Sequence, residues 1–464
     1  MNKNNTIQIE IDHEIRLSGT NLPDEVQARL RDILIFQNPQ WLDNEKRGFW
    51  NGNTQRYLYF LTEDTQGTLT LPRGFIHYLA GILKENGLTY TLIDKTRLVQ
   101  EVNFQFQGEL YDFQQQATQA ILDRRFGVIN CPTGGGKTII ALYCIAKRSQ
   151  PALVIVHTKE LLYQWQARAE EFLGLDRDDI GLIGDGHNRI GEKLTIAIVN
   201  SLYKCAKDIY QRIGFLIVDE CHHTPARTFI EAASVFDSRY MLGLSATPYR
   251  RDDLTQVIHF FIGNLLYTIS PKELQRQDKL MKAQVIVRQT SFDYDYRQSE
   301  DYQAMLTSLA EDIPRNTLIV NDVCQHVHVS KGIALVISDR KEHCNQLAHM
   351  LEQKQVSVRV LTGSVPKSKR QKIIEELNNG SIQVLVATSQ LVGEGFDLKQ
   401  LSALFLSTPV KFSGRIKQYV GRILRIDKEK EDATIYDYVD KAGVLRASFN
   451  WRIKAYQELG FKIQ

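Results

Sequence analysis

Several features are missing from this sequence, and each absence excludes a class of protein. No apolar run approaches the roughly 20 residues that a membrane-spanning helix needs, and the opening MNKNNTIQIEID has no apolar signal-peptide core. We therefore expect a cytoplasmic protein. The six cysteines are scattered without a CxxC pair, so the sequence predicts neither a zinc module nor a cysteine-ligated cluster.

A strong excess of charge is also missing. The formal net charge is only +3, which neither demands nor excludes a nucleic-acid partner, because such binding depends on a local basic surface. With 43% hydrophobic and 24% charged residues, the composition is that of a folded globular protein. A length of 464 residues exceeds one ordinary domain, and we expect about three domains.

What the chain does contain is an alternation of β-branched runs and amphipathic stretches, beginning near residue 110. FGVINC, PALVIVHT, LTIAIVNS and FLIVDE are typical of buried strands, and ELLYQWQARAEEFL between them is typical of a helix. After a looser stretch, the same alternation returns with GIALVISD, IQVLVATS and LSALFLST. The pattern predicts an α/β fold of two tandem doubly wound lobes, each with a parallel sheet.

These patterns divide the chain into four parts. We expect a small α+β accessory domain over residues 1–104, a first lobe over 105–270, a connecting segment over 271–330 and a second lobe over 331–464. The connecting segment is the least explained part, and it could be a simple link or carry a small DNA-gripping insertion.

The accessory domain holds a polar stretch, residues 37–56, in which aromatic and basic side chains are mixed. Such a mixture could stack on nucleic-acid bases and neutralise phosphates. A solvated loop on a folded domain explains the same composition, so both interpretations stay open. The side chains concerned are Trp41, Lys46, Arg47, Trp50 and Arg56.

The most specific motif is CPTGGGKT, which follows the strand-like FGVIN and precedes the helical TIIALYCIAKR. In this context glycines let backbone N–H groups curl around a β-phosphate, the helix N-terminus favours the anion, and the lysine reaches the β and γ oxygens. Cys131 stands where the strict motif has glycine. We expect ATP to bind Pro132, Thr133, Gly134, Gly135, Gly136, Lys137 and Thr138.

A second motif, FLIVDECHH, places two adjacent carboxylates at the end of a strand. Asp219 is expected to hold Mg²⁺ together with Thr138, and Glu220 to polarise the water that attacks the γ-phosphate. An Asp-Glu pair alone is common on solvated surfaces. After a buried strand and a phosphate loop, it predicts an ATP hydrolase with Mg²⁺ as cofactor.

The box Asp219-Glu220-Cys221-His222 resembles the DExH box of superfamily 2 helicases, and the other motifs of that family follow in the expected order. LYDFQQQA, VIVHTKELLYQW, TIAIVNSL and SATP stand in the first lobe, and ALVISDRKEH, VATSQLVGEGFD and QYVGRILR in the second. The resemblance covers roughly residues 105–460. It implies an ATP-dependent DNA helicase or translocase with two RecA-like lobes, able to work as a monomer.

The resemblance also implies roles for individual residues. Gln114 would read adenine, although Tyr111 stands where many relatives have arginine. Gly395 and Asp397 would contact the nucleotide from the second lobe. The residues implied to couple hydrolysis to lobe movement are His222, which could instead be an ordinary core histidine, Ser245, Ala246 and Thr247.

Positive charge from the second lobe would complete the catalytic site. Arg422 and Arg425 share one face of a helix, from which they could reach the γ-phosphate as arginine fingers, with Gln418 near them in the same motif. Taken alone, the segment would rather be a solvated basic helix. The resemblance further implies contacts to the nucleic-acid backbone, without sequence readout, at Thr158, Lys159, Arg340, Thr362, Gly363 and Thr388.

Within the superfamily, VDECHHTPA, GLSATPYRRDD and IYDYVD resemble the XPB branch of DNA helicases. The Arg-Glu-Asp signature of that branch would fall at Arg250, Arg251 and Asp252, where the middle residue is arginine, so an unwinding role tied to that signature loses its support. NPQWLDNEKRGFWNG and LPRGF resemble the amino-terminal domain of phage UvsW helicases. That similarity implies work on branched DNA in repair, recombination or phage defence.

Other functions stay open. The chain could be the ATPase motor of a restriction or defence complex whose nuclease lies on another chain, or it could act on RNA. A repair protein is a further candidate partner. A binding module without catalysis is contradicted by Lys137, Glu220 and Arg422.

Overall fold

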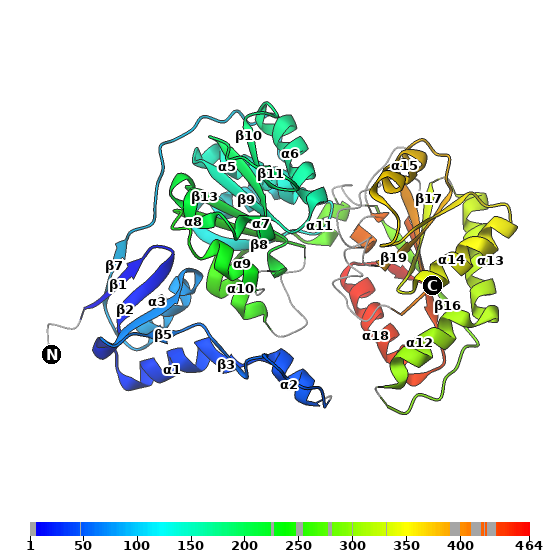
Figure 1. Ribbon diagram of the computed structural model, residues 1–464, viewed down its shortest axis with the longest axis horizontal. Helices are drawn as coiled ribbons and strands as arrows, with labels where there is room; N and C mark the ends of the chain where they lie inside the picture. The colour runs from blue at the N-terminus through cyan, green and yellow to red at the C-terminus, as the bar shows by residue number, and fades with distance from the viewer. Residues whose placement is uncertain are drawn as a thin grey trace. The chain divides into compact units, whose positions relative to one another are not determined.

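The computed structural model describes most of the chain and divides it into two compact units (Figure 1). The first comprises Met1–Cys131 and Gly136–Ile269, and the second comprises Pro132–Gly135 and Ser270–Gln464. Along the described parts, no helix combines the length and apolar character needed to pass through a bilayer. The described residues are 6–46, 48–223, 227–246, 254–276, 281–298, 300–330, 332–389, 400–409, 419–421, 423–424 and 433–464.

The first unit begins with a small α+β domain built on a mixed sheet. Its strand order is β5-β6-β2-β1-β7, with β1 parallel to β7 and antiparallel to β2. The alternate residues Ile7, Ile9 and Ile11 are buried in one core with apolar side chains of α1 and α3, as the period of a half-buried strand requires. The elements are β1 (Ile7–Ile11), β2 (Glu14–Ser18), α1 (Asp24–Leu34), β5 (Thr62–Glu63), β6 (Thr68–Pro72), α3 (Ile76–Glu85) and β7 (Tyr90–Asp94).

An arm, which we define as residues 35–59, leaves this domain after α1. Its strands β3 (Ile35–Gln37) and β4 (Tyr57–Tyr59) form a separate antiparallel pair. Between them stands α2 (Pro39–Lys46), which buries none of its side chains. Figure 1 shows α2 carried beyond the end of α1 by β3.

The first lobe is built on an eight-stranded sheet with the order β11-β10-β12-β9-β13-β14-β8-β15. All its pairs are parallel except β10 with β11. Helices α5 and α6 lie on one side and α7, α9 and α10 on the other (Figure 1). The strands are β8 (Phe126–Asn130), β9 (Ala152–Val156), β10 (Ile180–Gly184), β11 (His187–Asn188), β12 (Leu194–Ile198), β13 (Phe215–Asp219), β14 (Tyr240–Ser245) and β15 (Leu265–Thr268), and the helices are α4 (Asp112–Leu122), α5 (Lys137–Arg148), α6 (Lys159–Leu173), α7 (Val199–Leu202), α8 (Ala206–Ile209), α9 (Arg227–Ala233) and α10 (Thr255–Ile262).

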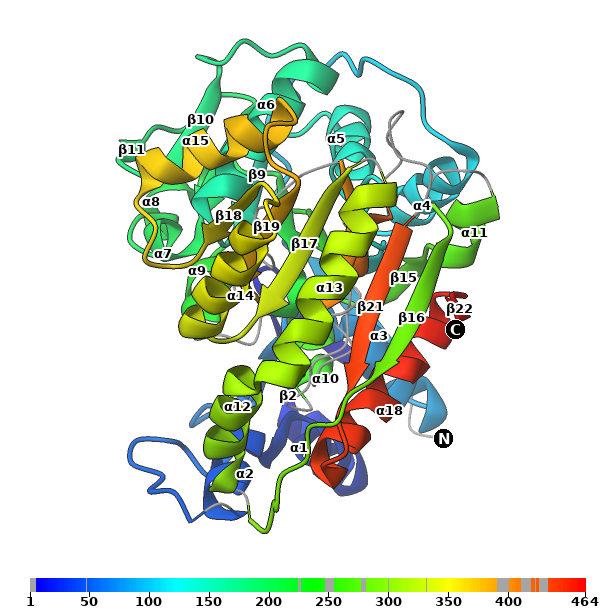
Figure 2. The same ribbon diagram turned by 90° about the vertical axis from the view of Figure 1, so that its right-hand side faces the viewer.

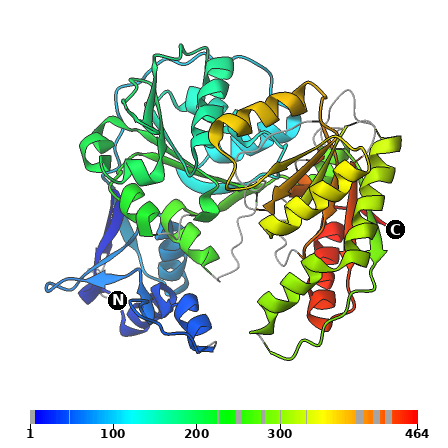
Figure 3. The ribbon, with the colours of Figure 1, turned by 45° about the vertical axis from the view of Figure 1, so that its right-hand side comes forward.

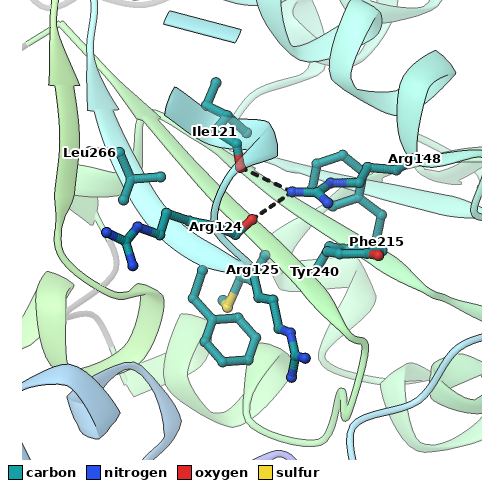
Figure 4. A pocket seen from close by; sticks show the side chains of 9 residues that line it. Ile121, Arg124, Arg125, Arg148, Phe215, Tyr240 and Leu266 are labelled. Atoms are coloured by element: carbon teal, nitrogen blue, oxygen red, sulfur yellow. Dashed lines mark hydrogen bonds between the residues drawn. The ribbon is translucent and has the colours of Figure 1, made fainter. Parts of the chain in front are cut away.

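Arg148, at the end of α5, clamps two helices of this lobe together. Its Nη2 donates to the carbonyl oxygens of Ile121 and Leu122, both at 3.0 Å, and also to that of Arg124. The guanidinium carbon lies 3.9 Å from the centre of the Tyr240 ring (Figure 4). The last carbonyl groups of a helix have no partner within the helix, so Arg148 supplies the hydrogen-bond donor that the carboxyl end of α4 needs. The pocket shown in Figure 4 is lined in part by Arg148, Ile121 and Tyr240 and therefore has a structural explanation.

The small domain is fastened to the first lobe through Arg73, whose side chain is buried. Nη1 of Arg73 donates to the carbonyl oxygens of Phe236, at 3.2 Å, and Ser238, at 2.8 Å. Its guanidinium carbon lies 4.8 Å from the centre of the Phe126 ring. Burial lowers the pKa of Arg73 to about 10, so the group stays charged at neutral pH.

Two further contacts reinforce this attachment. A Cβ placed on Gly74 would lie 2.5 Å from the backbone nitrogen of Gly263, so only glycine fits where the two parts meet. Arg97 donates from Nε and Nη2 to the two carboxylate oxygens of Asp237, at 3.0 and 2.8 Å. One apolar core runs from the small domain into the lobe, and together they form one packed body.

The second unit contains a seven-stranded sheet with the order β18-β19-β17-β20-β21-β16-β22, in which every pair is parallel. The predicted parallel α/β fold of two lobes is thus confirmed. The strands are β16 (Ala283–Gln289), β17 (Ile333–Ser338), β18 (Val358–Leu361), β19 (Val384–Thr388), β20 (Leu401–Leu406), β21 (Ala433–Val439) and β22 (Lys462–Ile463), and the helices include α11 (Pro271–Arg276), α12 (Asp301–Glu311), α13 (Ile313–Val329), α14 (Lys341–Gln353), α15 (Lys367–Asn378) and α18 (Gly443–Glu458).

Two neighbouring residues of β21 show that helices cover both faces of this sheet. Tyr438 donates from its hydroxyl to Asp322 of α13 at 3.1 Å, whereas Asp437 accepts from Arg452 of α18 at 2.7 Å. Successive strand residues point to opposite faces, so α13 and α18 lie on opposite sides. Figures 2 and 3 show α13 on one side of the strands and α18 on the other.

The structure differs from the predicted division of the chain at residues 271–330. Residues 271–330, predicted as a connecting segment, contribute α13 and the strand β16, which pairs with β21 along seven residues. The second lobe therefore begins well before residue 331. The strand AQVIVRQ was missed because it lies near the sheet edge and is only partly buried, so it lacks the continuous apolar run of a central strand.

We expect Arg73→Met to destabilise the first unit. The substitution leaves the buried carbonyl groups of Phe236 and Ser238 without a donor, which should lower the free energy of unfolding by about 3 kcal/mol. Urea denaturation measures the effect, with Arg29→Met as the matched control, because Arg29 forms only an exposed ion pair with Glu85 and should shift the midpoint little. Equal midpoints for the two variants would contradict the role given to Arg73.

Candidate nucleotide-binding site

Four neighbouring strands of the first lobe bring the predicted site residues to one edge of the sheet. β9, β13, β14 and β8 are adjacent and parallel, so their carboxyl ends lie together. The phosphate loop follows β8, Asp219 ends β13 and Ser245 ends β14. This edge is where α/β sheets usually bind ligands.

The predicted phosphate loop has the backbone that its glycines imply. Gly134 and Gly136 have φ values of 89° and 80°, in the left-handed region that favours glycine. The Cys131 N–H donates to the Ser245 carbonyl at 2.9 Å and fastens the loop to β14. Since α5 begins at Lys137, the helix N-terminus is presented directly after the loop, where an anion is favoured.

Asp219 is held by two hydrogen bonds at the end of β13. Oδ2 accepts from the Trp165 indole N–H at 2.8 Å, and Oδ1 accepts from the Glu220 backbone N–H at 2.9 Å. Burial raises the pKa of Asp219, although the Lys137 ammonium and the Trp165 bond oppose that effect. The two hydrogen bonds therefore fix the carboxylate's orientation.

Glu220 lies among positive and polar partners. Its φ of 48° is unusual for a residue other than glycine, and such strained backbone is frequent at functional sites. Oε1 pairs with the Lys137 ammonium, and Oε2 lies 3.3 Å from Nδ1 of His222. Burial by itself would raise the pKa of Glu220, but Lys137 and His222 outweigh it and the pKa is lowered. The carboxylate is therefore ionised while these partners are in place.

His222 joins this carboxylate to the next strand. Its Nδ1 lies 3.2 Å from the Ser245 hydroxyl oxygen as well as close to Glu220. Two of the residues predicted to couple hydrolysis to movement are therefore in contact, and Ala246 follows directly in the chain. Thr247 lies outside the described residues.

Gln114 lies against the phosphate loop. Its Oε1 accepts from the Tyr111 N–H at 3.0 Å in a capping box at the start of α4. A Cβ built on Gly136 would meet its Nε2 at 2.4 Å, which shows how near the amide is to the loop backbone. Its reading of adenine stays a prediction.

The donors at this edge fit Mg²⁺ shared with a nucleotide. In the described residues, no group of three or more His, Cys, Asp or Glu side chains could hold a metal by itself. Mg²⁺ commonly takes one or two protein oxygens, with phosphates and water completing an octahedron. Asp219 has further lone pairs on both oxygens, and Thr138 adds a hydroxyl in the first turn of α5.

Five predicted residues of the second lobe cannot be placed. Gln418, Arg422 and Arg425 of the expected catalytic set lie outside the described residues. So do Gly395 and Asp397, expected to contact the nucleotide. Their roles stay predictions.

The predicted nucleic-acid contacts of the first lobe have local partners. The Thr158 hydroxyl accepts from the Leu161 N–H at 3.2 Å and caps α6. Lys159 pairs with Asp185. These contacts are what a turn and a helix cap require, so the role in nucleic-acid binding stays a prediction.

The predicted contacts of the second lobe follow its strands. Arg340, after β17, donates from Nη2 to Oε1 of Gln303 at 2.7 Å. Thr362, after β18, lies 2.9 Å from the Ser364 hydroxyl. The other two, Gly363 and Thr388, follow β18 and end β19, so the set lies at the carboxyl ends of strands.

Two residues beside the site, Trp165 and His157, were not predicted. Trp165 resembles an ordinary core position of an amphipathic helix, and nothing in its local sequence indicates a bond to Asp219. His157 is half-buried near His222, and removal of the ring from water, reinforced by His222, lowers the pKa of His157 to about 4. His157, directly after the strand PALVIV, offered a signal, because side chains at strand ends reach the site.

Two family models match this chain. "Type III restriction enzyme, res subunit" matches residues 107–250, and "Helicase conserved C-terminal domain" matches residues 319–427. Together these ranges span more than half of the chain. The chain is a superfamily 2 helicase. As such, it binds and hydrolyses ATP and acts on nucleic acid.

Relatives of this helicase include viral and archaeal proteins. Probable helicase D10 of Escherichia phage T5 is 27% identical over 382 residues, which cover 82% of each chain. DNA 3′-5′ translocase XPB2 of Sulfurisphaera tokodaii is 26% identical over 371 residues, which cover 72% of this helicase and 82% of the relative. The predicted resemblance to the XPB branch is thereby confirmed.

A solved structure supports the assignment of the fold. S. cerevisiae Dbp5, bound to RNA and ADP BeF3, aligns with 83% of this helicase and 92% of its own chain at a TM-score of 0.55 and 14% identity. T4 UvsW aligns with 99% of this helicase and 98% of its own chain, at a TM-score of 0.45 and 18% identity. That score is low, so the UvsW-like character of residues 1–104 stays a prediction.

We expect Trp165→Phe to raise the Mg²⁺ concentration required for ATP hydrolysis. Phenylalanine keeps an aromatic ring but removes the N–H that orients Asp219, and loss of such a bond typically weakens metal binding about 10- to 100-fold. The measurement is the ATPase rate against Mg²⁺ at saturating ATP. Trp451→Phe is the control, because Trp451 is exposed on α18. An unchanged Mg²⁺ requirement would show that Trp165 has no role in metal binding.

Proposed function

We propose that this helicase is a DNA-dependent ATPase that translocates 3′ to 5′ and unwinds or remodels branched DNA. The observation that carries the proposal is the chain of contacts Lys137–Glu220–His222–Ser245 at the carboxyl edge of the first-lobe sheet. The name of the XPB2 relative, a DNA 3′-5′ translocase, supports the substrate and the polarity.

In this proposal, Lys137 exchanges partners when ATP binds. Its ammonium pairs with Glu220 and lies at the start of α5, directly after the phosphate loop. The phosphates of ATP carry more negative charge than one carboxylate. Moving Lys137 to the β- and γ-phosphates frees Glu220 to accept a proton from the attacking water. The same contact thus holds Glu220 ionised before ATP arrives and releases it for catalysis afterwards.

Asp219 and Thr138 would hold Mg²⁺ on the phosphates. The bound ion would neutralise charge that develops on the phosphate oxygens. Trp165 and the Glu220 N–H would hold Asp219 in a fixed orientation for this role. Gln114, against the loop that holds the phosphates, would contact adenine at the other end of the nucleotide.

The second lobe would supply the remaining positive charge. Arg422 and Arg425 would stabilise the transition state, with Gln418 near the attacking water, and Gly395 and Asp397 would contact the nucleotide. Because each lobe would contribute part of the site, hydrolysis would depend on lobe closure. A single chain with both lobes could then work as a monomer.

DNA would be held along its backbone. Phosphate contacts suit a motor that steps along any sequence, because they carry no sequence information. Lys159 would exchange Asp185 for a phosphate, and Arg340 would exchange Gln303 in the same way. The other proposed contacts are Thr158, Thr362, Gly363 and Thr388.

A second function is favoured by one observation. The model that matches residues 107–250 is described as the res subunit of a type III restriction enzyme. The helicase could therefore be the motor of a restriction or defence complex with the nuclease on another chain. Addition of a candidate nuclease chain to a DNA-cleavage assay with ATP distinguishes this role, since the helicase alone should not cut.

We expect Glu220→Gln to abolish ATP hydrolysis, with a rate loss of about 100-fold or more, while ATP binding persists. Steady-state hydrolysis is measured with forked DNA, blunt duplex DNA, single-stranded DNA and RNA of equal length. Glu192→Gln, at an exposed position of the same lobe, serves as the control. Stimulation by RNA but not DNA would overturn the DNA assignment, and full activity of Glu220→Gln would overturn the catalytic one.

We expect Ser245→Ala to reduce strand separation more than ATP hydrolysis. The substitution removes the hydroxyl beside His222 but leaves the pair of Glu220 with Lys137 in place. DNA-stimulated hydrolysis should fall by a few fold at most, and unwinding of a forked duplex by about tenfold, as expected for a coupling free energy of 1 to 3 kcal/mol. Equal losses of hydrolysis and unwinding would show that Ser245 does not couple ATP hydrolysis to strand separation.

A further inference from the structure

The arm, residues 35–59, is fixed at its base to the first lobe. The Phe60 ring, next to β4, packs edge to face on Phe260 and Phe261 of α10, with ring centres 5.8 Å apart in both cases. On its other side Phe60 contacts Phe36 of β3, also at 5.8 Å. The arm is therefore anchored at its root by aromatic packing.

The far end of the arm is folded by its own hydrogen bonds. The Phe49 N–H donates to the Asn44 carbonyl at 2.8 Å, and the Thr54 N–H donates to the Asn51 carbonyl at 2.8 Å. The side chains of Asn44 and Asn51 are joined at 3.1 Å. Such an arrangement holds the tip in a defined shape without burying an apolar core.

This ordered tip presents large aromatic side chains to solvent. Trp50 is 90% exposed and Phe49 is 61% exposed. One side of the Trp50 ring lies against Gly52, where an added Cβ would meet Cζ3 at 2.9 Å. Covering exposed rings at a fixed tip with a flat apolar partner lowers the free energy, because apolar surface is removed from water.

Polar and positive groups accompany these rings. The Arg56 guanidinium carbon lies 5.1 Å from the centre of the Trp41 ring, and Lys46 is exposed at the end of α2. The arm has three basic and two acidic side chains, one of the basic ones, Arg47, outside the described residues. A hollow of about 570 Å³ is lined by Asn38, Gln40, Asn53, Thr54, Gln55 and Leu58.

The chemistry of this hollow suits nucleobases. Asn and Gln amides offer both donors and acceptors, which match the hydrogen-bonding edges of unpaired bases. Aromatic rings stack on the faces of such bases whatever their sequence. A purely apolar or purely charged partner would leave one of these two sets of groups unsatisfied.

We propose that the arm captures unpaired bases of the DNA substrate, with Trp50 and Phe49 stacking on them and the amide-lined hollow receiving a base edge. Duplex bases are already stacked and paired, so the arm should act where strands separate. The proposal rests on the DNA substrate proposed above. It adds a contact to bases that backbone-gripping lobes lack, at a point fixed relative to the first lobe.

The test uses the full chain with Phe49→Ala/Trp50→Ala, and Trp451→Ala as the control, because Trp451 is a 62% exposed tryptophan of the second unit. Binding to a labelled fork with single-stranded flaps and to a blunt duplex is measured by fluorescence anisotropy at one salt concentration, without ATP. Stacking is worth about tenfold in affinity per base, so fork binding should weaken about tenfold or more. Duplex binding and the control should change less than twofold.

Three results would overturn the proposal. The first is unchanged binding to the fork. The second is an equal loss of affinity for the fork and for the blunt duplex, which indicates contact with the backbone. The third is a loss of affinity in Trp50→Phe, which keeps an aromatic ring, as large as the loss in the double alanine variant. ATP hydrolysis without DNA should be unchanged in the double variant and reports that the chain is folded. Failure of the substrate proposal is recognised separately, as wild-type hydrolysis that DNA does not stimulate.

Discussion

In the proposed mechanism, the chemistry of the first lobe depends on the ion pair between Lys137 and Glu220. It joins residues 83 positions apart and requires three features to coincide: parallel strands that end at one edge, glycines that turn the loop into the N-terminus of α5, and a left-handed backbone at Glu220. Two charges held away from water are costly unless they are paired. Within the site each charge is balanced by the other, and a triphosphate can compete for the lysine.

The small domain and the first lobe share one core, so the proposed capture of bases by the arm would be linked to the first lobe. Arg73 and the pair of Arg97 with Asp237 fasten the domain near β14, and α10 supports the root of the arm. Any displacement of the first lobe therefore carries the arm with it. A helicase built this way would hold a strand at the arm while ATP hydrolysis moves the lobes.

Motifs with local sequence context could be predicted, and contacts made by tertiary packing could not. The meeting of Lys137, Asp219 and Glu220 at one sheet edge could be predicted, because a glycine loop or a buried apolar strand next to them leaves little choice of conformation. The contacts of Trp165 and Arg73 could not, since a tryptophan on an amphipathic helix and an arginine in a turn have many ordinary roles. Their partners, Asp219 and the carbonyls of Phe236 and Ser238, come from distant segments.

The second lobe illustrates the same limit. Central strands such as GIALVISD are recognisable by continuous apolar character, whereas β16 is partly exposed and was assigned to a connection. The aromatic and basic composition of the arm was visible in the sequence, but both nucleic-acid binding and a solvated loop remained possible. The sequence alone does not tell whether a tryptophan is covered by other residues. The fold shows that Trp50 is uncovered and held on an ordered tip.

Strand separation under single-turnover conditions tests the central claim most directly. The helicase is preassembled on a duplex with either a 3′ or a 5′ single-stranded tail, and the release of the labelled strand is followed after ATP and Mg²⁺ are added together with a trap for free protein. The account predicts ATP-dependent release from the 3′-tailed duplex and little from the 5′-tailed one. ATP hydrolysis without release from either substrate would contradict it.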